Sequence, residues 1–168
     1  MKGWASRERL DSAMEFRLAA QADLKQLAQM RWEYWAEGGL DPAEQDEKAF
    51  VDKFIGILGA RLNKDWFVWC AVEGEEILSH IYVELIPKVP KPSRLEDAFG
   101  YVSNALTRRS HRNAGIGSRL MEHMKSWALK RNLEFLVLWP SPQSKPFWAR
   151  SGFSVGDPLI LEIRPYVF

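Results

Sequence analysis

The segment best suited to chemistry is residues 112–117, Arg-Asn-Ala-Gly-Ile-Gly, which separates an apolar run from an amphipathic one. It is expected to form the turn between a strand and a helix. The first amide N–H groups of a helix lack internal partners, and the helix dipole places partial positive charge there. Glycine at positions 115 and 117 lets an anion approach these amides closely. The sequence therefore predicts a phosphate cradle built from backbone.

The residues around the loop discriminate between kinds of phosphate site. Positive charge gathers beside it on Arg108, Arg109 and Arg112. A P-loop requires Gly-Lys-Ser/Thr, whereas Gly117 is followed by Ser118 and Arg119. A dinucleotide-binding loop requires a third glycine where Leu120 stands. Both of these sites are excluded, while a turn that needs glycine only for packing remains an alternative.

The elements that must position this loop follow from the spacing of apolar residues. Strands are expected at residues 14–18, 66–72, 76–86, 98–107 and 135–139, with one or two more within 153–163. Helices are expected at residues 22–37, from 42 to about 62, at 116–131 and at 143–151. The order is β-α-α-β-β-β-α-β-α-β-β, which indicates one mixed α/β domain over residues 14–168 after a loose leader at 1–13.

The first two helices carry apolar stripes at helical spacing. In the first, the stripe is Leu24, Leu27, Ala28, Trp32 and Trp35. In the second, it is Phe50, Phe54, Ile57, Leu58 and Leu62. Asp41 is the predicted N-cap of the second helix, with Pro42 at its first position.

Composition narrows the class of protein. The formal net charge is +1, whereas nucleic-acid and membrane-surface proteins normally show a basic excess. The chain has only one cysteine, Cys70, so it has no internal disulfide. This cysteine is expected to be packed in a strand. His80, His111 and His123 form no evident metal or catalytic set, so no metal is predicted. The start has no signal-peptide core, and no apolar run nears the length of about 20 residues that a membrane helix needs. A cytoplasmic location is expected.

Several ordered motifs together resemble one family. Residues 112–117 match the R/Q-x-x-G-x-G/A signature of the GNAT N-acetyltransferases. Residues 100–104 resemble the strand before that loop, and residues 145–153 resemble the later Y-x-x-x-G-F element. Arg17, Leu18, Ala19 and Asp23 resemble the family's first strand-to-helix turn. The resemblance spans residues 14–163 and implies an α/β (α+β) fold, with a mixed, mostly antiparallel sheet flanked by helices.

The resemblance also implies the ligand, acetyl-CoA, and the residues that hold it. The pyrophosphate would lie on Arg112, Asn113, Ala114, Gly115, Ile116, Gly117 and Ser118. The pantetheine arm would run along Ala105, Leu106 and Thr107, with the Leu106 N–H on the acetyl carbonyl. Ser141 stands where many relatives have an asparagine that contacts the cofactor. A homodimer is common among relatives.

The implied reaction is direct attack of a primary amine, on a small molecule or a peptide, at the thioester. Candidate bases are Tyr101, which stands where some relatives carry a glutamate, and Glu84 on the neighbouring strand. Their alternatives are a core or cofactor-lining tyrosine and a solvent-facing glutamate. The acceptor is expected near residues 31–40, where aromatic residues could form a pocket and Glu33 or Glu37 could attract a cationic amine. The two tryptophans there could equally anchor the helix.

Two positions depart from the family pattern. Trp148 replaces the tyrosine that often protonates the leaving thiolate, and an indole N–H is no acid near neutral pH. The thiolate then leaves unaided, or water or another side chain serves, or Trp148 fills the core, or the protein only senses acyl-CoA. Asn113-Ala114 stand where relatives often have glycine and a basic residue, and asparagine tolerates left-handed backbone. A nucleotide-phosphate binder unrelated to CoA is a further alternative.

Overall fold

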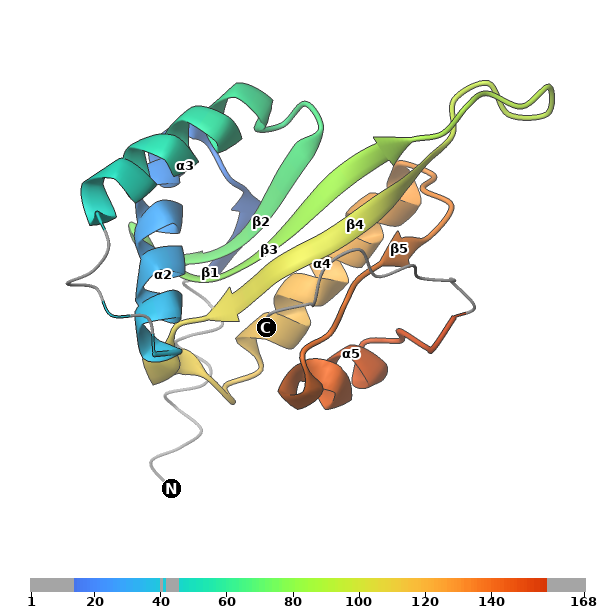
Figure 1. The fold of residues 1–168 in the computed structure, drawn as a ribbon. Helices are drawn as coiled ribbons and strands as arrows, with labels where there is room; N and C mark the ends of the chain where they lie inside the picture. The colour runs from blue at the N-terminus through green and yellow to red at the C-terminus, as the bar shows by residue number, and fades with distance from the viewer. Residues whose placement is uncertain (1–13, 40, 42–45, 157–168) are drawn as a thin grey trace.

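The computed structural model describes residues 14–39, 41 and 46–156, and a five-stranded sheet forms its centre (Figure 1). The strands, in spatial order, are β1 (Met14–Leu18), β2 (Trp66–Glu73), β3 (Glu76–Pro87), β4 (Ala98–Thr107) and β5 (Leu136–Val137). The first three pairings are antiparallel and the pairing of β4 with β5 is parallel. The predicted mixed, mostly antiparallel sheet is confirmed.

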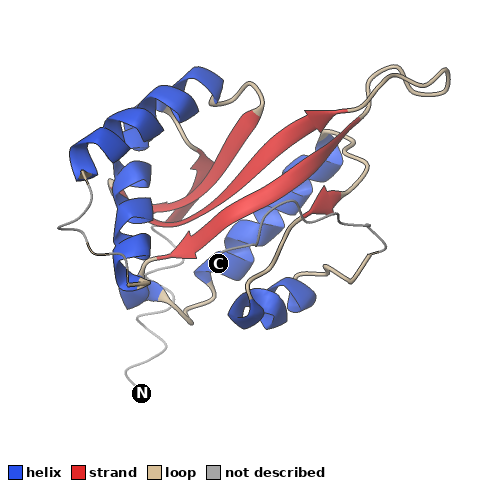
Figure 2. Cartoon of the chain, viewed as in Figure 1, coloured by secondary structure: helices blue, strands red, loops and turns tan. Residues whose placement is uncertain are grey.

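Helices lie on both faces of this sheet (Figure 2). Those on one face are α2 (Leu24–Glu37) and α3 (Glu47–Arg61), and α4 (Ile116–Lys130) covers the other. A short helix, α5 (Lys145–Arg150), follows β5. Single 3-10 turns stand at η1 (Gln21–Asp23), η3 (Arg109–His111) and η4 (Pro142–Ser144). No helix in the described part of the chain is long and apolar enough to cross a membrane.

The two-sided cover explains the sequence of the central strands. Successive side chains of a strand point to opposite faces, so Cys70 packs with α2 and α3 while Ala71 packs with α4. In β3, Tyr82 and Val83 divide in the same way. Because both faces are buried, these strands appear as nearly continuous apolar runs. A tight turn joins β2 to β3, with Gly74 at a φ of 60°.

The second helix begins later than predicted. Residues 42–45, including the expected first position, lie outside the described residues, and α3 itself starts only at Glu47. The side chain of Asp46 caps it by accepting the Ala49 N–H at 2.9 Å. The predicted stripe is wrong at Ile57, which is 53% exposed and borders an open cavity, whereas Leu58 is buried. In α2, Trp35 is likewise 38% exposed rather than buried.

The region after α4 is less regular than predicted. The strand expected at residues 135–139 is only Leu136–Val137, and both residues are half-buried rather than covered on both faces. Residues 153–156 are not a strand, and residues 157–163 lie outside the described part. Because β5 is short, most of one edge of β4 has no strand beside it among the described residues, and the site described next lies along that edge.

Candidate active site

The turn into α4 presents free amides. Gly115 is the N-cap, with a φ of 81°, and Asn113 has a φ of 63°, so both take the left-handed conformation that glycine and asparagine tolerate. No side chain caps the helix. Because the Arg119 N–H is the one that reaches the Gly115 carbonyl, at 3.1 Å, the amides of residues 116–118 have no intrahelical acceptor.

The second glycine of the loop keeps a narrow space open. A Cβ at Gly117 would lie 3.4 Å from the Thr107 hydroxyl and 3.7 Å from the Phe147 ring. A larger side chain would therefore fill the space between the end of β4 and α5, in front of the free amides. The loop as folded fits a diphosphate, because it offers N–H donors and the positive end of a helix dipole without obstruction.

Next to this loop, β4 and β5 separate. They pair only at Gly100 with Leu136 and at Tyr101 with Val137, and then diverge (Figure 1). A cavity of about 340 Å³, here called the β4–β5 cavity, opens along the unpaired part of β4. Its lining is Arg31, Tyr34, Trp35, Gly38, His80, Val102, Ser103, Asn104, Ala105, Leu106, Leu138, Trp139, Ser141, Ser144 and Trp148.

A bulge in β4 shapes this cavity. Tyr82 pairs with Ser103 and His80 pairs with Leu106, so two residues of β4 stand opposite Ile81 alone. One of them, Asn104, is left-handed at a φ of 48°. Bulges turn backbone groups out of the ladder, and here the bulge faces the opening between the strands.

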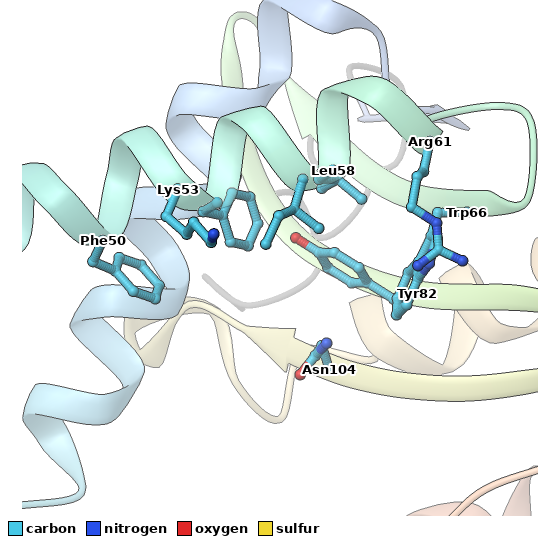
Figure 3. A pocket seen from close by; sticks show the side chains of 9 residues that line it. Phe50, Lys53, Leu58, Arg61, Trp66, Tyr82 and Asn104 are labelled. Carbon is cyan, nitrogen blue, oxygen red and sulfur yellow. The ribbon is translucent and has the colours of Figure 1, made fainter.

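A second cavity lies between α3 and the sheet, with Asn104 at its border (Figure 3). This α3 cavity has a volume of about 230 Å³. Its lining is Phe50, Lys53, Phe54, Ile57, Leu58, Arg61, Trp66, Tyr82 and Asn104. Asn104 lines both cavities, so both spaces border the bulge.

Comparisons with known proteins agree with this geometry. The chain matches the Acetyltransferase (GNAT) family over residues 24–153. It shares 32% identity with the structure of a GCN5-related N-acetyltransferase from Ralstonia eutropha, with a TM-score of 0.70, covering 89% of this chain and 98% of that one. A predicted acetyltransferase from Clostridium acetobutylicum, solved with acetyl-CoA, has 24% identity and a TM-score of 0.70, covering 90% and 96%. No curated protein matches the chain.

The chain belongs to the GNAT acetyltransferase family. It is an acetyl-CoA-dependent acyltransferase, as the resemblance implied. The glucosamine-6-phosphate N-acetyltransferase of Arabidopsis thaliana shares the fold at 15% identity, with a TM-score of 0.63, covering 89% of this chain and 97% of that one.

The predicted cofactor residues of this GNAT protein lie together. Ala105, Leu106, Ser141 and Trp148 line the β4–β5 cavity. Thr107 closes the strand beside Gly117, and the loop residues 112–118 form the uncapped opening of α4. Their contacts with acetyl-CoA remain predictions.

Two arginines near the loop are held by acids of α2. Arg108 pairs with Glu33 and Arg112 pairs with Glu37, each at 3.2 Å. The Arg112 Nε also donates to the Thr107 carbonyl at 3.0 Å. Glu33 and Glu37, expected to attract the acceptor amine, therefore pair with the arginines beside the loop, and neither lines the β4–β5 cavity or the α3 cavity.

Trp148 is packed in the core and also lines the β4–β5 cavity. It is 8% exposed and packs edge-on against Phe147 and Phe153. Its indole N–H donates to the Ser144 hydroxyl at 3.1 Å, which also accepts from Ser141 at 3.1 Å. The N–H is therefore directed to Ser144, and burial accounts for the tryptophan at this position.

The two predicted bases are cross-strand neighbours. Glu84 of β3 stands opposite Tyr101 of β4. Glu84 forms an ion pair of 2.6 Å with Arg61, and Tyr101 packs edge-on against Trp139 at 5.3 Å. Neither residue lines the β4–β5 cavity or the α3 cavity. As bases, both remain predictions.

His80 is a functional candidate that the sequence did not single out. It lines the β4–β5 cavity and is 2% exposed. Its Nδ1 lies 2.8 Å from the Asn104 carbonyl, which only accepts, so Nδ1 carries the proton and Nε2 is the basic atom. Burial lowers the pKa of His80 to about 4, so the ring is neutral. The buried Nε2 has no partner among the described residues.

Cys70 is excluded as a nucleophile. It is fully buried among apolar residues of the α2–α3 face. Burial raises the pKa of its thiol to about 12, so it carries no thiolate near neutral pH. The packed cysteine that the sequence predicted is confirmed.

Proposed function

We propose that this GNAT protein transfers the acetyl group of acetyl-CoA to a primary amine by direct attack. The observation that carries the proposal is the arrangement of three features along β4. The free amides of α4 lie beside Thr107 at the end of β4, and the unpaired stretch of β4 runs from there to the bulge, where Asn104 borders both cavities. Such an arrangement can hold a long thioester from one side and an acceptor from the other.

Backbone groups of the loop and of β4 bind acetyl-CoA. The amides of residues 116–118 hold the diphosphate, and backbone groups of Ala105 and Leu106 hold the pantetheine arm as an added strand would. The Leu106 N–H donates to the thioester carbonyl and stabilises the negative charge that develops on its oxygen. Acetyl-CoA supplies the activated acyl group.

The reaction proceeds by direct attack, without a covalent enzyme intermediate. The neutral amine nitrogen attacks the carbonyl carbon, a C–N bond forms and the C–S bond breaks. The products are the N-acetyl amide and coenzyme A. Because the Trp148 N–H already donates to Ser144, the thiolate leaves without an acid from this residue and takes its proton from water.

The proton lost by the amine needs an acceptor. His80 lines the β4–β5 cavity, its buried Nε2 has a lone pair without a partner among the described residues, and its Nδ1 bond to Asn104 fixes the ring. We add it to Glu84 and Tyr101 as a candidate base, acting directly or through water.

Thiol release tests this function. Purified protein is incubated with acetyl-CoA and a panel of primary amines, and free thiol and the mass of the acetylated product are followed. Amine-dependent release of thiol is the expected result. Saturable CoA binding without thiol release across the panel would contradict acetyl transfer to primary amines.

A glycine pair provides the control. Gly117→Leu fills the space in front of the amides and should abolish CoA binding. Gly56→Leu adds the same side chain on the exposed face of α3, where a Cβ meets nothing within 4 Å, and should bind CoA normally. Equal CoA affinity of the two variants would contradict the assignment of the loop.

A further inference from the structure

Arg31 of α2 is a partly buried cation without an acidic partner. One of its guanidinium nitrogens donates to the side-chain oxygen of Asn104, and the group lies 5.9 Å from the Trp35 ring centroid. No carboxylate pairs with it in the described part of the chain. Five other arginines there do pair with carboxylates: Arg17, Arg61, Arg94, Arg108 and Arg112.

Arg31 is placed where the anionic group of a bound ligand can pair with it. Its guanidinium lines the β4–β5 cavity, and burial lowers its pKa because water is excluded from the charge. A partly desolvated cation is costly unless an anion or hydrogen-bond acceptors compensate it. A carboxylate matches the two-pronged geometry of a guanidinium better than any other common anion except phosphate.

Neither cavity contains an opposing charge. Among the described residues that line them, none is aspartate or glutamate, and the cations are Arg31, Lys53 and Arg61. His80 is neutral, and Arg61 is itself paired with Glu84. A field of this sign repels a polyamine and favours an amine whose own molecule carries a negative charge.

The α3 cavity adds an apolar wall and one unused donor. Its surface is formed mainly by aromatic and aliphatic side chains of α3, β2 and β3. Tyr82 is 2% exposed, and Figure 3 shows its hydroxyl directed toward α3 within the cavity. That hydroxyl has no hydrogen-bond partner in the described residues, although a buried O–H normally has one. Burial raises the pKa of Tyr82 well above its usual range, so the group stays a donor.

We propose that the acceptor is a free amino acid with an apolar side chain, its carboxylate bound by Arg31 and its side chain lodged in the α3 cavity. This inference rests on the proposed function. Asn104, which accepts from Arg31 and lines both cavities, joins the two subsites at the bulge of β4. The Tyr82 hydroxyl supplies a hydrogen bond to a polar group of the bound acceptor.

The same charge assists the chemistry. A cation near the acceptor's ammonium group lowers the pKa of that group and increases the fraction of neutral, nucleophilic amine. The acceptor's own carboxylate anchors the molecule to Arg31. The site therefore needs no protein carboxylate near the amine, where such a group would raise the pKa of the amine. Arg31 therefore acts as a specificity residue.

Matched acceptors test the proposal. Phenylalanine, phenylalaninamide and phenethylamine share one apolar group and differ in the carboxylate, and spermidine serves as the cationic amine. The expected kcat/KM for phenylalanine exceeds those of the amide and the amine by about 10- to 100-fold, the range of a charged hydrogen-bonded contact. Equal values, or a preference for spermidine, would overturn the inference while leaving acetyl transfer to amines intact.

Variants separate binding from folding. Arg31→Gln should reduce the preference for phenylalanine over its amide to a few fold, and Arg31→Lys should restore part of it. Arg150→Gln, at an exposed position at the end of α5, should leave the preference unchanged. Thermal melting of each variant shows whether it is folded. An unchanged preference in a folded Arg31→Gln protein would refute the role of Arg31.

Tyr82→Phe provides a second measurement. Removal of a buried, unpartnered hydroxyl should leave the protein as stable as before or more stable. The KM for phenylalanine should nevertheless rise several fold. An unchanged KM would remove Tyr82 from the acceptor site.

Binding tests the inference when turnover is absent. If no amine releases thiol while CoA still binds, titration of N-acetylphenylalanine against its methyl ester, with CoA present, replaces the kinetic comparison. Tighter binding of the acid that disappears in Arg31→Gln would sustain the subsite although the proposed function had failed. Equal binding of acid and ester would overturn the subsite.

Discussion

Asn104 organises the site at the scale of single residues. Its left-handed backbone makes the bulge, its carbonyl accepts from His80, and its side chain accepts from Arg31. One residue thus fixes the tautomer of a candidate base and the position of a candidate anion-binding group. Its substitution should disturb both at once.

The burial of His80 predicts a dependence of stability on pH. Its pKa is about 4 in the folded protein and about 6.5 in the unfolded chain. The buried neutral ring therefore costs no stability above pH 6.5. The free energy of unfolding falls as the pH drops from 6.5 toward 4, because in this range only the unfolded chain binds the proton. Between pH 7.5 and 5, the wild-type protein should lose about 2 kcal/mol more than His80→Asn. Urea unfolding at both values measures this difference, and parallel losses would contradict it.

The contacts of Trp148 predict a structural effect. Trp148→Phe removes the N–H that binds Ser144 and should cost about 1 kcal/mol of stability. Trp148→Tyr should not increase turnover, because the polar atom at this position is directed to Ser144 rather than into the cavity. Chemical denaturation and steady-state kinetics test the two statements. Faster thiol release by Trp148→Tyr would show that a missing acid limits the wild-type enzyme.

At the scale of elements, α3 depends on its cap. Asp46→Ala removes the acceptor for the Ala49 N–H and should cost about 1 kcal/mol. Asp52→Ala, on the exposed face of the same helix, removes only a surface ion pair with Lys48 and is the matched control. Thermal unfolding compares them, and equal melting temperatures would contradict the capping role. Because α3 forms the wall of the α3 cavity, Asp46→Ala should also weaken acceptor binding.

The elements show which features sequence patterns can predict. Strong periodicity located β2, β3, β4 and α4, and the glycines located the turn into α4, because local spacing determines each of them. The bulge at Asn104 was not predicted, since it depends on which residues of β3 and β4 pair. Trp35 and Ile57 were wrong as buried residues, because periodicity cannot show that a face borders a cavity instead of a neighbouring element.

The same limit applies to the site. The motif supplied the loop residues and the wall at Leu106, Ser141 and Trp148. His80 and Arg31 come from β3 and α2 and meet only through Asn104, so no local signal connected them. The acids Glu33 and Glu37 looked free in the sequence because their arginine partners are 75 residues away along the chain.

At the scale of the whole molecule, ligand binding and stability are coupled. A ligand that binds only the folded chain stabilises it, by about 2.7 kcal/mol at a concentration 100 times its Kd. The melting temperature should therefore rise with CoA concentration in the wild-type protein and in Gly56→Leu, but not in Gly117→Leu. Scanning fluorimetry over a CoA titration measures the shift, and a rise in Gly117→Leu would place the ligand elsewhere.

The divergence of β4 from β5 has a consequence for dynamics. Beyond Tyr101, the edge of β4 that faces the opening has no neighbouring strand within the described part of the chain to shield its N–H groups from solvent. Deuterium should enter those amides of residues 102–107 rapidly in the free protein and slowly once pantetheine occupies the gap. The interior amides of β3, shielded by β2 and β4 alike, should exchange slowly throughout. On this proposal, the pantetheine arm of acetyl-CoA occupies the place of a strand beside β4, and this edge of β4 is exposed again each time coenzyme A leaves.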